Sequence, residues 1–178
     1  MAVHASAILI PALAYATSKS IALTALIGVT ALYSLSEALR LSGRRLPFIT
    51  EFTLRMSRDE ERPHFATPPI YLAAGAILSL AFFPEGIAYA AIAIVALGDP
   101  VASYVGGRFG RTHIGQKTLE GFVAGLIVSF SAALLWVHPS LALVGSAVGM
   151  LLELLGLLND NITTPIGAGL AMIIASIL

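Results

Sequence analysis

The stretch IAYAAIAIVALGDPVASYV, residues 87–105, decides the class of fold. It is apolar along almost its whole length and close to the roughly 20 residues that a helix needs to cross the hydrocarbon core of a bilayer. Its single charged residue is Asp99, which falls in its last two turns. Because an acid inside a membrane span usually faces a protein interior or a wet cavity, Asp99 marks a candidate site.

The composition of the whole chain places this stretch in a membrane protein. Of 178 residues, 57% are hydrophobic and 11% are charged, and the mean hydropathy is +0.89; soluble domains carry about one-quarter charged residues. Without a linker in the sequence, we expect one integral-membrane domain over residues 1–178. The net charge of zero argues against nucleic acid as a partner, and the absence of cysteine excludes disulfides and thiolate chemistry.

Six further apolar runs surround the opening stretch, which predicts an all-α polytopic protein with six to seven transmembrane helices. The first run is short for a span, so it is tilted, partial or capped by its neighbours, and it lacks the basic region and cleavage site of a signal peptide. The runs cover residues 3–16, 21–41, 68–83, 87–105, 119–137, 140–158 and 162–178.

Three polar segments separate these runs, at residues 42–67, 106–117 and 159–161. The first contains Phe48, Phe52, Leu54 and Met56 among its charges, which is typical either of an amphipathic helix on the membrane surface or of a solvated loop. Both interpretations remain open from the sequence.

Cations fix the expected orientation, because Arg and Lys are retained on the cytoplasmic side. With residues 42–67 inside, nine of the ten cations fall on the cytoplasmic side and only Lys19 falls outside. The same alternation puts five acids from distant parts of the chain at the cytoplasmic ends of spans, with Glu85 alone facing out. These acids are Glu37, Asp99, Glu120, Glu153 and Asp160.

Carboxylates at one depth beside glycines and an isolated lysine fit phosphate chemistry with a divalent metal. Magnesium takes one or two carboxylates together with phosphate oxygens, while a lysine and free backbone N–H groups hold the remaining negative charge. A nucleotide is the expected phosphate carrier. A P-loop is rejected, because Gln116 separates Gly115 from Lys117 and the segment follows an apolar helix instead of a strand.

The order of these motifs resembles the CTP-dependent lipid kinases, a family that includes dolichol, phytol and diacylglycerol kinases. Weaker similarities are His4 in the first run and Glu37 with Arg40 at the end of the second. This chain departs from the family's pattern at two places. The Arg-Lys pair that often precedes the first-span histidine is missing, and Asn159 stands where the family commonly has an acid. The resemblance rests on Gly98-Asp99, Ala102-Ser103, Gly106, Arg108-Phe109-Gly110, Lys117-Thr118-Leu119-Glu120-Gly121, Glu153, Asp160-Asn161 and Pro165.

The resemblance implies transfer of the γ-phosphate of CTP, with Mg²⁺, to the hydroxyl of a membrane lipid alcohol, with polyprenol or dolichol favoured, giving lipid phosphate and CDP. The expected catalytic residues are Asp99, Lys117, Glu120, Glu153 and Asp160. Asp99 and Asp160 would bind the metal. Nucleotide binding is expected at Gly106, Gly107, Arg108, Gly110, Lys117, Thr118 and Asn161.

Several roles stay open at this level. Either Glu120 or Glu153 could accept the proton of the lipid hydroxyl or serve as a further metal ligand. Glu37 with Arg40 is expected to be a helix-end ion pair, and the four histidines show no metal-ligand spacing, with His113 the favoured exception because of its place in the glycine-rich segment. A site on the cytoplasmic face of the cell membrane follows from the orientation, and a homodimer is compatible with it.

Two other function classes compete. A cytidylyltransferase making CDP-archaeol or CDP-diacylglycerol carries a similar glycine and Lys-Thr-Glu-Gly segment, but its late basic signature is missing, since no Lys or Arg follows Lys117. A small transporter fits poorly, because the charged motifs gather at one face instead of lining a path across the membrane.

Overall fold

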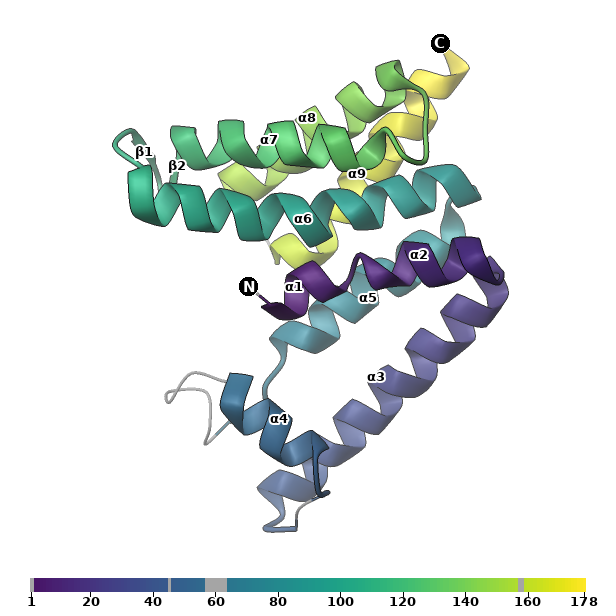
Figure 1. The fold of residues 1–178 in the computed structure, drawn as a ribbon, viewed down its shortest axis with the longest axis vertical. Helices are drawn as coiled ribbons and strands as arrows, with labels where there is room; N and C mark the ends of the chain where they lie inside the picture. Colours follow the sequence, from purple (N-terminus) through teal and green to yellow (C-terminus); the bar gives the residue numbers. More distant parts are fainter. Residues whose placement is uncertain (1, 45, 57–63, 157–158) are drawn as a thin grey trace.

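The computed structural model describes residues 2–44, 46–56, 64–156 and 159–178, which form helices and one short β-hairpin (Figure 1). Three helices are long and apolar enough to cross a membrane in these ranges, namely α3, α6 and α9. The elements are α1 (Ala2–Ser6), α2 (Leu9–Ala16), α3 (Lys19–Leu41), α4 (Ile49–Met56), α5 (Pro68–Phe82), α6 (Glu85–Phe109), β1 (His113–Ile114), β2 (Lys117–Thr118), α7 (Leu119–Ala133), α8 (Pro139–Leu155) and α9 (Asp160–Ile177).

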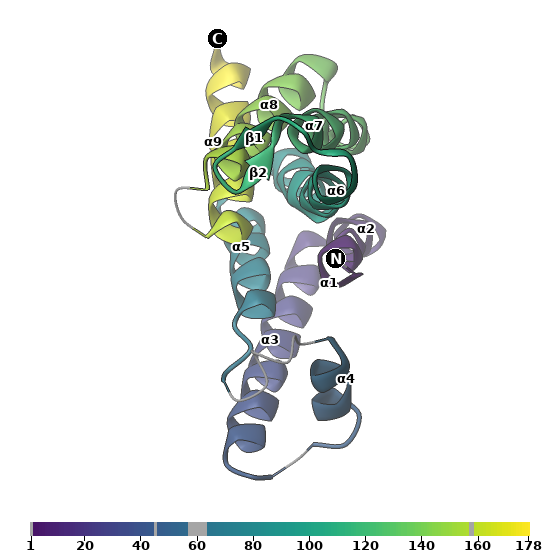
Figure 2. The same cartoon turned by 90° about the vertical axis from the view of Figure 1, so that its left-hand side faces the viewer.

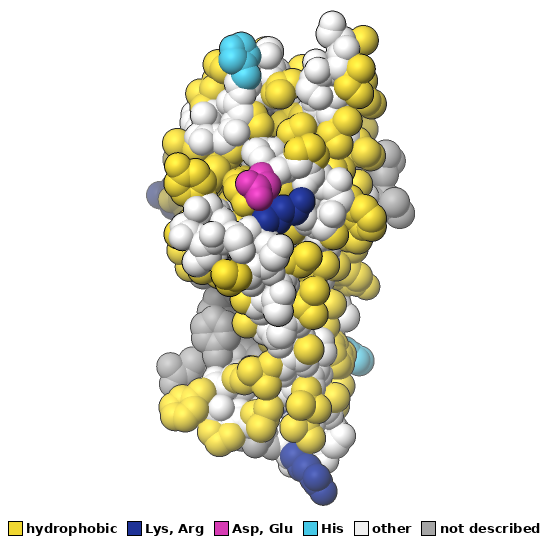
Figure 3. Space-filling view, turned by 90° about the vertical axis from the view of Figure 1, so that its right-hand side faces the viewer, with side chains coloured by type: hydrophobic (Ala, Val, Ile, Leu, Met, Phe, Trp, Pro, Cys, Tyr) yellow, Lys and Arg dark blue, Asp and Glu magenta, His cyan; other side chains and the backbone are white. Residues whose placement is uncertain are grey.

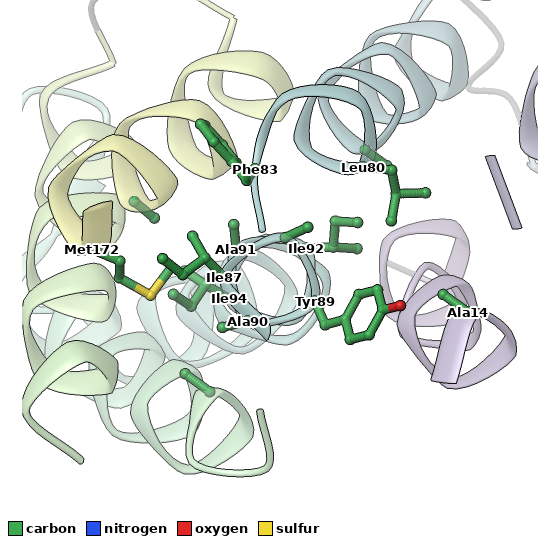
Figure 4. Packing of buried hydrophobic residues seen from close by; sticks show 14 of the residues in the cluster. Ala14, Leu80, Phe83, Ile87, Tyr89, Ala90, Ala91, Ile92, Ile94 and Met172 are labelled. Carbon is green, nitrogen blue, oxygen red and sulfur yellow. The ribbon is translucent and has the colours of Figure 1, made fainter. Parts of the chain in front are cut away.

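Helix α6 is the centre of the molecule. Residues 87–96 are buried without interruption, as expected for a helix that is apolar all round. Helices α7, α8 and α9 pack on one side of it and the α1–α2 segment on the other, with α5 beside α9 (Figures 1 and 2). In Figure 4, Phe83 and Met172 lie to one side of α6, and Tyr89 points from α6 toward Ala14 of α2.

The first apolar run is broken into two helices, α1 and α2. Pro11 has no N–H to donate to the carbonyl of Ala7, and its ring would clash with that carbonyl in a continuous helix. The break falls at residues 7–8. It explains why the run is too short for a regular span.

Helix α3 diverges from the others and keeps much of its apolar surface exposed (Figure 1). Its end is anchored by the predicted ion pair: Arg40 donates to both carboxylate oxygens of Glu37, at 2.9 and 2.8 Å. Glu37 is fully buried and also accepts the backbone N–H of Ala66 at 3.0 Å, while Arg40 donates to the carbonyl of His64. The pair therefore fastens α3 to the chain that enters α5.

The connecting segments gather at two ends of the helices. The hairpin, the N-terminus, α4 and the start of α9 lie toward the end that faces the viewer in Figure 2. The turns between α2 and α3, α5 and α6, and α7 and α8 lie at the opposite end (Figure 3). There, hydrophobic and uncharged side chains dominate, and Lys19 donates to the carbonyl of Phe83 at 2.7 Å.

The structure corrects several details of the predicted fold. The predicted all-α class is confirmed, because the regular structure of the described residues is helical apart from one short hairpin that was not expected, in which residues 113–114 pair with residues 117–118. Four apolar helical segments have 10–17 residues, shorter than expected for regular spans: His4–Ala16, Pro68–Phe82, Leu119–Ala133 and Pro139–Leu155. Six to seven spans therefore remain a prediction.

The polar segments are also shorter than predicted. Helix α6 continues through residues 106–109, and Asp160 and Asn161 belong to the first turn of α9 instead of a loop. The helix α4 is present within residues 42–67, which favours the helical interpretation of that segment over a loop. Part of the predicted charged cluster, comprising Arg45, Arg58, Asp59, Glu60, Glu61 and Arg62, lies outside the described residues.

The close contact between α5 and α9 yields a test of this packing. A Cβ atom at Gly75 would press against the backbone carbonyl of Asn161, whereas a Cβ at Gly28 of α3 would meet nothing within 4 Å. We expect Gly75→Ala to destabilise the protein by about 1–3 kcal/mol through overpacking. Gly28→Ala should be neutral or stabilising, because alanine favours helix. Thermal unfolding in detergent measures both variants, and equal melting temperatures would contradict the packing.

Candidate functional site

The hairpin between α6 and α7 positions the candidate site. His113 pairs with Thr118 and Ile114 with Lys117, and Gly115 at the turn adopts a φ of +62°, which favours glycine. Thr118 then caps α7 by accepting the N–H of Gly121 at 3.2 Å. The hairpin thus fixes Lys117 directly before the start of a helix.

Lys117 is held between two carboxylates from other helices. Its Nζ lies 2.9 Å from Oε1 of Glu153 on α8 and 2.8 Å from Oδ2 of Asp160 on α9. Burial disfavours the charged ammonium, but the two carboxylates outweigh burial and raise the pKa of Lys117 above its usual value. The lysine is therefore a fixed cation at neutral pH.

Each of these carboxylates keeps one oxygen without a partner. Glu153 Oε2 and Asp160 Oδ1 are buried and accept no hydrogen bond from the described residues. Glu153 is only 2% exposed. Buried polar atoms are normally satisfied, so these two oxygens beside one lysine remain able to accept a hydrogen bond or a cation.

Asp99 belongs to a second branch of the same network. His4 Nε2 donates to Oδ1 of Asn161 at 2.6 Å and lies 3.5 Å from Oδ2 of Asp99. Because Asn161 follows Asp160 in α9, the two branches meet at the start of that helix. Ser103, one turn after Asp99, makes a longer contact of 3.4 Å with its carboxylate. Five segments thereby converge: α1, α6, the hairpin, α8 and α9.

A cavity of about 570 Å³ opens beside Lys117. It lies between the end of α6, the hairpin, the start of α7 and the end of α8. Among the residues that line it are Gly106, Gly107, His113, Gln116, Lys117 and Glu153. A cation and a buried acid thus face a space of the size expected for a small-molecule ligand.

The glycines of this segment serve two purposes. A side chain on Gly106 or Gly110 would collide with Thr118, so both glycines allow the hairpin to lie against α6. Gly107 has no neighbour within 4 Å of a would-be Cβ, and it lines the cavity. Gly107 is therefore the position where a ligand can approach the backbone most closely.

Glu120 and Arg108 lie apart from the Lys117 cluster. Both oxygens of Glu120 accept the backbone N–H of Thr112, at 3.1 and 3.2 Å. Arg108 lies over the ring of Phe109, 5.8 Å from its centroid. Both residues line a separate cavity of about 460 Å³.

The predicted metal ligands Asp99 and Asp160 fall in the two different branches. In the described part of the chain, no group of three or more His, Asp or Glu side chains is close enough together to hold a metal ion. The charge of Asp99 nevertheless acts on Glu153, so the three acids share one electrostatic environment. Glu153 and Asp160 are joined by their shared partner Lys117, and of the two only Glu153 is among the residues that line the cavity.

His4 is the residue whose place the sequence did not predict. It was one histidine in a short apolar run, and only its similarity to the first-span histidine of the lipid kinases pointed to it. Among the four histidines, the sequence favours His113 for a place in the site, and His113 lines the cavity. The sequence marks Gln116 only as a departure from the P-loop pattern, whereas the structure places it in the lining of the cavity.

Comparisons with known proteins do not add to this geometry. No family model, curated protein or solved structure matches the chain. The proposal below therefore rests on the residues and their contacts.

The Lys117 cluster predicts a measurable loss of stability when the cation is removed. Lys117→Met leaves two carboxylates without a counter-charge, so we expect the melting temperature in detergent to fall by about 3–10 °C. Arg111→Met, an exposed cation in the same segment, should change it little. Adding Glu153→Gln to Lys117→Met should recover part of the loss. An unchanged melting temperature for Lys117→Met would contradict the ion pairs.

Proposed function

We propose that the protein is a membrane phosphotransferase that transfers the γ-phosphate of CTP to a lipid alcohol. The observation that carries the proposal is Lys117 held between Glu153 and Asp160 at the edge of a cavity with an accessible glycine backbone. A lysine together with backbone N–H groups suits nucleotide phosphates, and carboxylates suit the magnesium that accompanies them.

The residues present fit Mg²⁺ at one place. Glu153 Oε2 and Asp160 Oδ1 are the buried oxygens without a partner, and hard oxygen ligands are those that magnesium prefers. Two carboxylates complemented by phosphate oxygens would complete the binding, which accounts for the absence of a three-residue group among the described residues. When bound, the metal would neutralise negative charge on the phosphates. Asp99 would contribute through its charge.

On the nucleotide side, Lys117 is the group best arranged to bind phosphate oxygens, and Gly107 leaves space for the ligand beside the end of α6. Gly106, Gly110 and Thr118 would support them by holding the hairpin against α6, because Thr118 already caps α7. Asn161 is hydrogen-bonded to His4 and would contact the nucleotide from the opposite side of the first turn of α9. Arg108 lines the neighbouring cavity and would meet only an extended part of the ligand.

In the transfer step, the oxygen of the lipid hydroxyl bonds to the γ-phosphorus as the bond from that phosphorus to the β-phosphate oxygen breaks. CDP leaves, and the hydroxyl proton passes to a carboxylate. Glu120 is disfavoured for this role because both of its oxygens accept the N–H of Thr112, and Glu153 is already held by Lys117 and assigned to the metal. Asp99, beside His4 in the other branch, is the carboxylate that remains for it. Lys117 would offset the charge that builds up on the phosphates.

The membrane setting follows from the same arrangement. The three long apolar helices would span the bilayer together with the shorter ones, giving six to seven spans. The end that carries the hairpin would face the cytoplasm, where CTP is available. A polyprenol or dolichol is the favoured acceptor.

The function is tested with purified protein in detergent, Mg²⁺, CTP labelled on the γ- or α-phosphate, and a panel of lipid alcohols and phospholipids. We expect γ-label on a lipid alcohol, release of CDP and no α-label on lipid. Transfer of α-label with release of pyrophosphate would replace the kinase with a cytidylyltransferase. Absence of any transfer across the panel would contradict both enzymes.

A pair of acidic residues at opposite ends of the molecule provides the control. Asp99→Asn should abolish turnover while the melting temperature stays within a few degrees. Glu85→Gln, an exposed acid at the start of α6, should retain full activity. Comparable activity in the two variants would remove Asp99 from the site.

A further inference from the structure

A third cavity, of about 240 Å³ and largely apolar, lies between the α1–α2 segment, α3 and α5. Three walls form it: the segment joining α1 to α2, one face of α3 and the first turns of α5. Its lining includes Ala7, Val29, Thr30, Tyr33, Leu72 and Ala73. Within the described residues it carries no charged side chain.

The hydroxyl groups of Tyr33 and Thr30 in its wall already donate hydrogen bonds to backbone carbonyls. Tyr33 donates its hydroxyl to the carbonyl of Ala66 at 3.0 Å, and Thr30 donates to the carbonyl of Leu26 at 2.7 Å. The ring of Tyr33 and the methyl group of Thr30 remain to face the groove. Its chemistry is therefore that of a hydrocarbon-binding surface.

Helix α1 contributes to both the groove and the candidate site, through Ser6 and His4 respectively. Ala7 follows His4 by three residues, or about 4.5 Å along a helical axis, and His4 contacts Asn161 and Asp99. On α3 the groove reaches Val29, near the middle of that helix, whereas on α5 it covers only the first turns. It thus runs from the end that holds the polar network toward mid-depth of the longest exposed helix.

We propose that this groove binds the hydrocarbon chain of the lipid acceptor, with the hydroxyl of the lipid at His4, Asp99 and Asn161. This assignment rests on the proposed function and names the route by which its second substrate approaches. CTP would enter from the hairpin side and the lipid from the α3 side, so the two ligands would meet at the first turn of α9. The separation of the network into a Lys117 branch and a His4 branch supports this division.

An acyl or isoprenoid chain suits the groove better than a second copy of the protein. The groove lies between three segments of the chain and carries no charged side chain among the described residues, and α1 connects it to a network that a hydroxyl can join. A bulk phospholipid would bring a charged headgroup to the same network, beside the carboxylate of Asp99. Repulsion between the phosphate and that carboxylate would favour an uncharged alcohol.

Binding is tested without catalysis by photolabelling the protein in detergent with a long-chain primary alcohol that carries a diazirine in its chain. We expect adducts at Val29, Tyr33 and Ala73, mapped by mass spectrometry and lost when unlabelled alcohol is added. A phosphatidylcholine of equal chain length should compete at least tenfold less well. Labelling spread evenly over the exposed apolar faces, or equal competition by the phospholipid, would overturn the proposal.

A substitution that fills the groove tests the same proposal by enzyme kinetics. Val29→Trp should raise the KM for the lipid alcohol at least tenfold and leave the KM for CTP unchanged. Ile27→Trp, an exposed position on α3 outside the groove, should alter neither value. An unchanged acceptor KM for a folded Val29→Trp variant would refute the groove while the kinase stands. Specific labelling without any phosphate transfer would instead retain the groove and reject the kinase.

Discussion

The sharing of one ammonium by two carboxylates is the interaction on which the candidate site depends. Glu153 would be costly to bury as an anion without Lys117, and Asp160 supplies a second negative charge at the same place. One cation cannot satisfy four carboxylate oxygens. The two buried oxygens that remain have no hydrogen-bond partner among the described residues, and the proposed function assigns them to a divalent cation.

The fold places these groups together through close helix packing. Helix α6 brings Asp99, α8 brings Glu153 and α9 brings Asp160, and glycines at the contacts among these helices lie against larger side chains such as Met150 and Met172. Small residues let helix backbones approach in a setting where burial of apolar surface gives little driving force. The hairpin then supplies Lys117 from a segment outside the helices. Rigid helices and a short hairpin together fix the geometry.

The sequence predicts the helices more reliably than their ends. The apolar runs mark every long helix, and the Glu37–Arg40 pair was predicted and is present. The hairpin was not predicted, because residues 113–118 contain too few residues for strand periodicity to appear. Asn159 caps α9 by accepting the N–H of Asn161, so Asp160 and Asn161 are helical although their polarity suggested a loop. Pro11 breaks the first run because it has no N–H group to donate and its ring clashes with the carbonyl of Ala7. A hydropathy pattern does not show this effect.

The candidate site is likewise predicted only in part by the sequence. Lys117, Glu153 and Asp160 were predicted as residue types, and the structure brings them together. The structure does not bring Glu120 to them, since its carboxylate closes a local turn around Thr112. His4 joins the network only through tertiary contacts with Asn161 and Asp99, which no local pattern encodes.

The central claim is that the Lys117 cluster binds a nucleotide together with a divalent cation. The most direct measurement is thermal stabilisation of the purified protein by CTP and Mg²⁺, separately and together, compared with Glu153→Gln. The account predicts that the combination raises the melting temperature of the wild-type protein by several degrees, that CTP alone has little effect, and that Glu153→Gln loses the gain. Equal stabilisation by CTP with and without Mg²⁺, or an undiminished gain in Glu153→Gln, would contradict it.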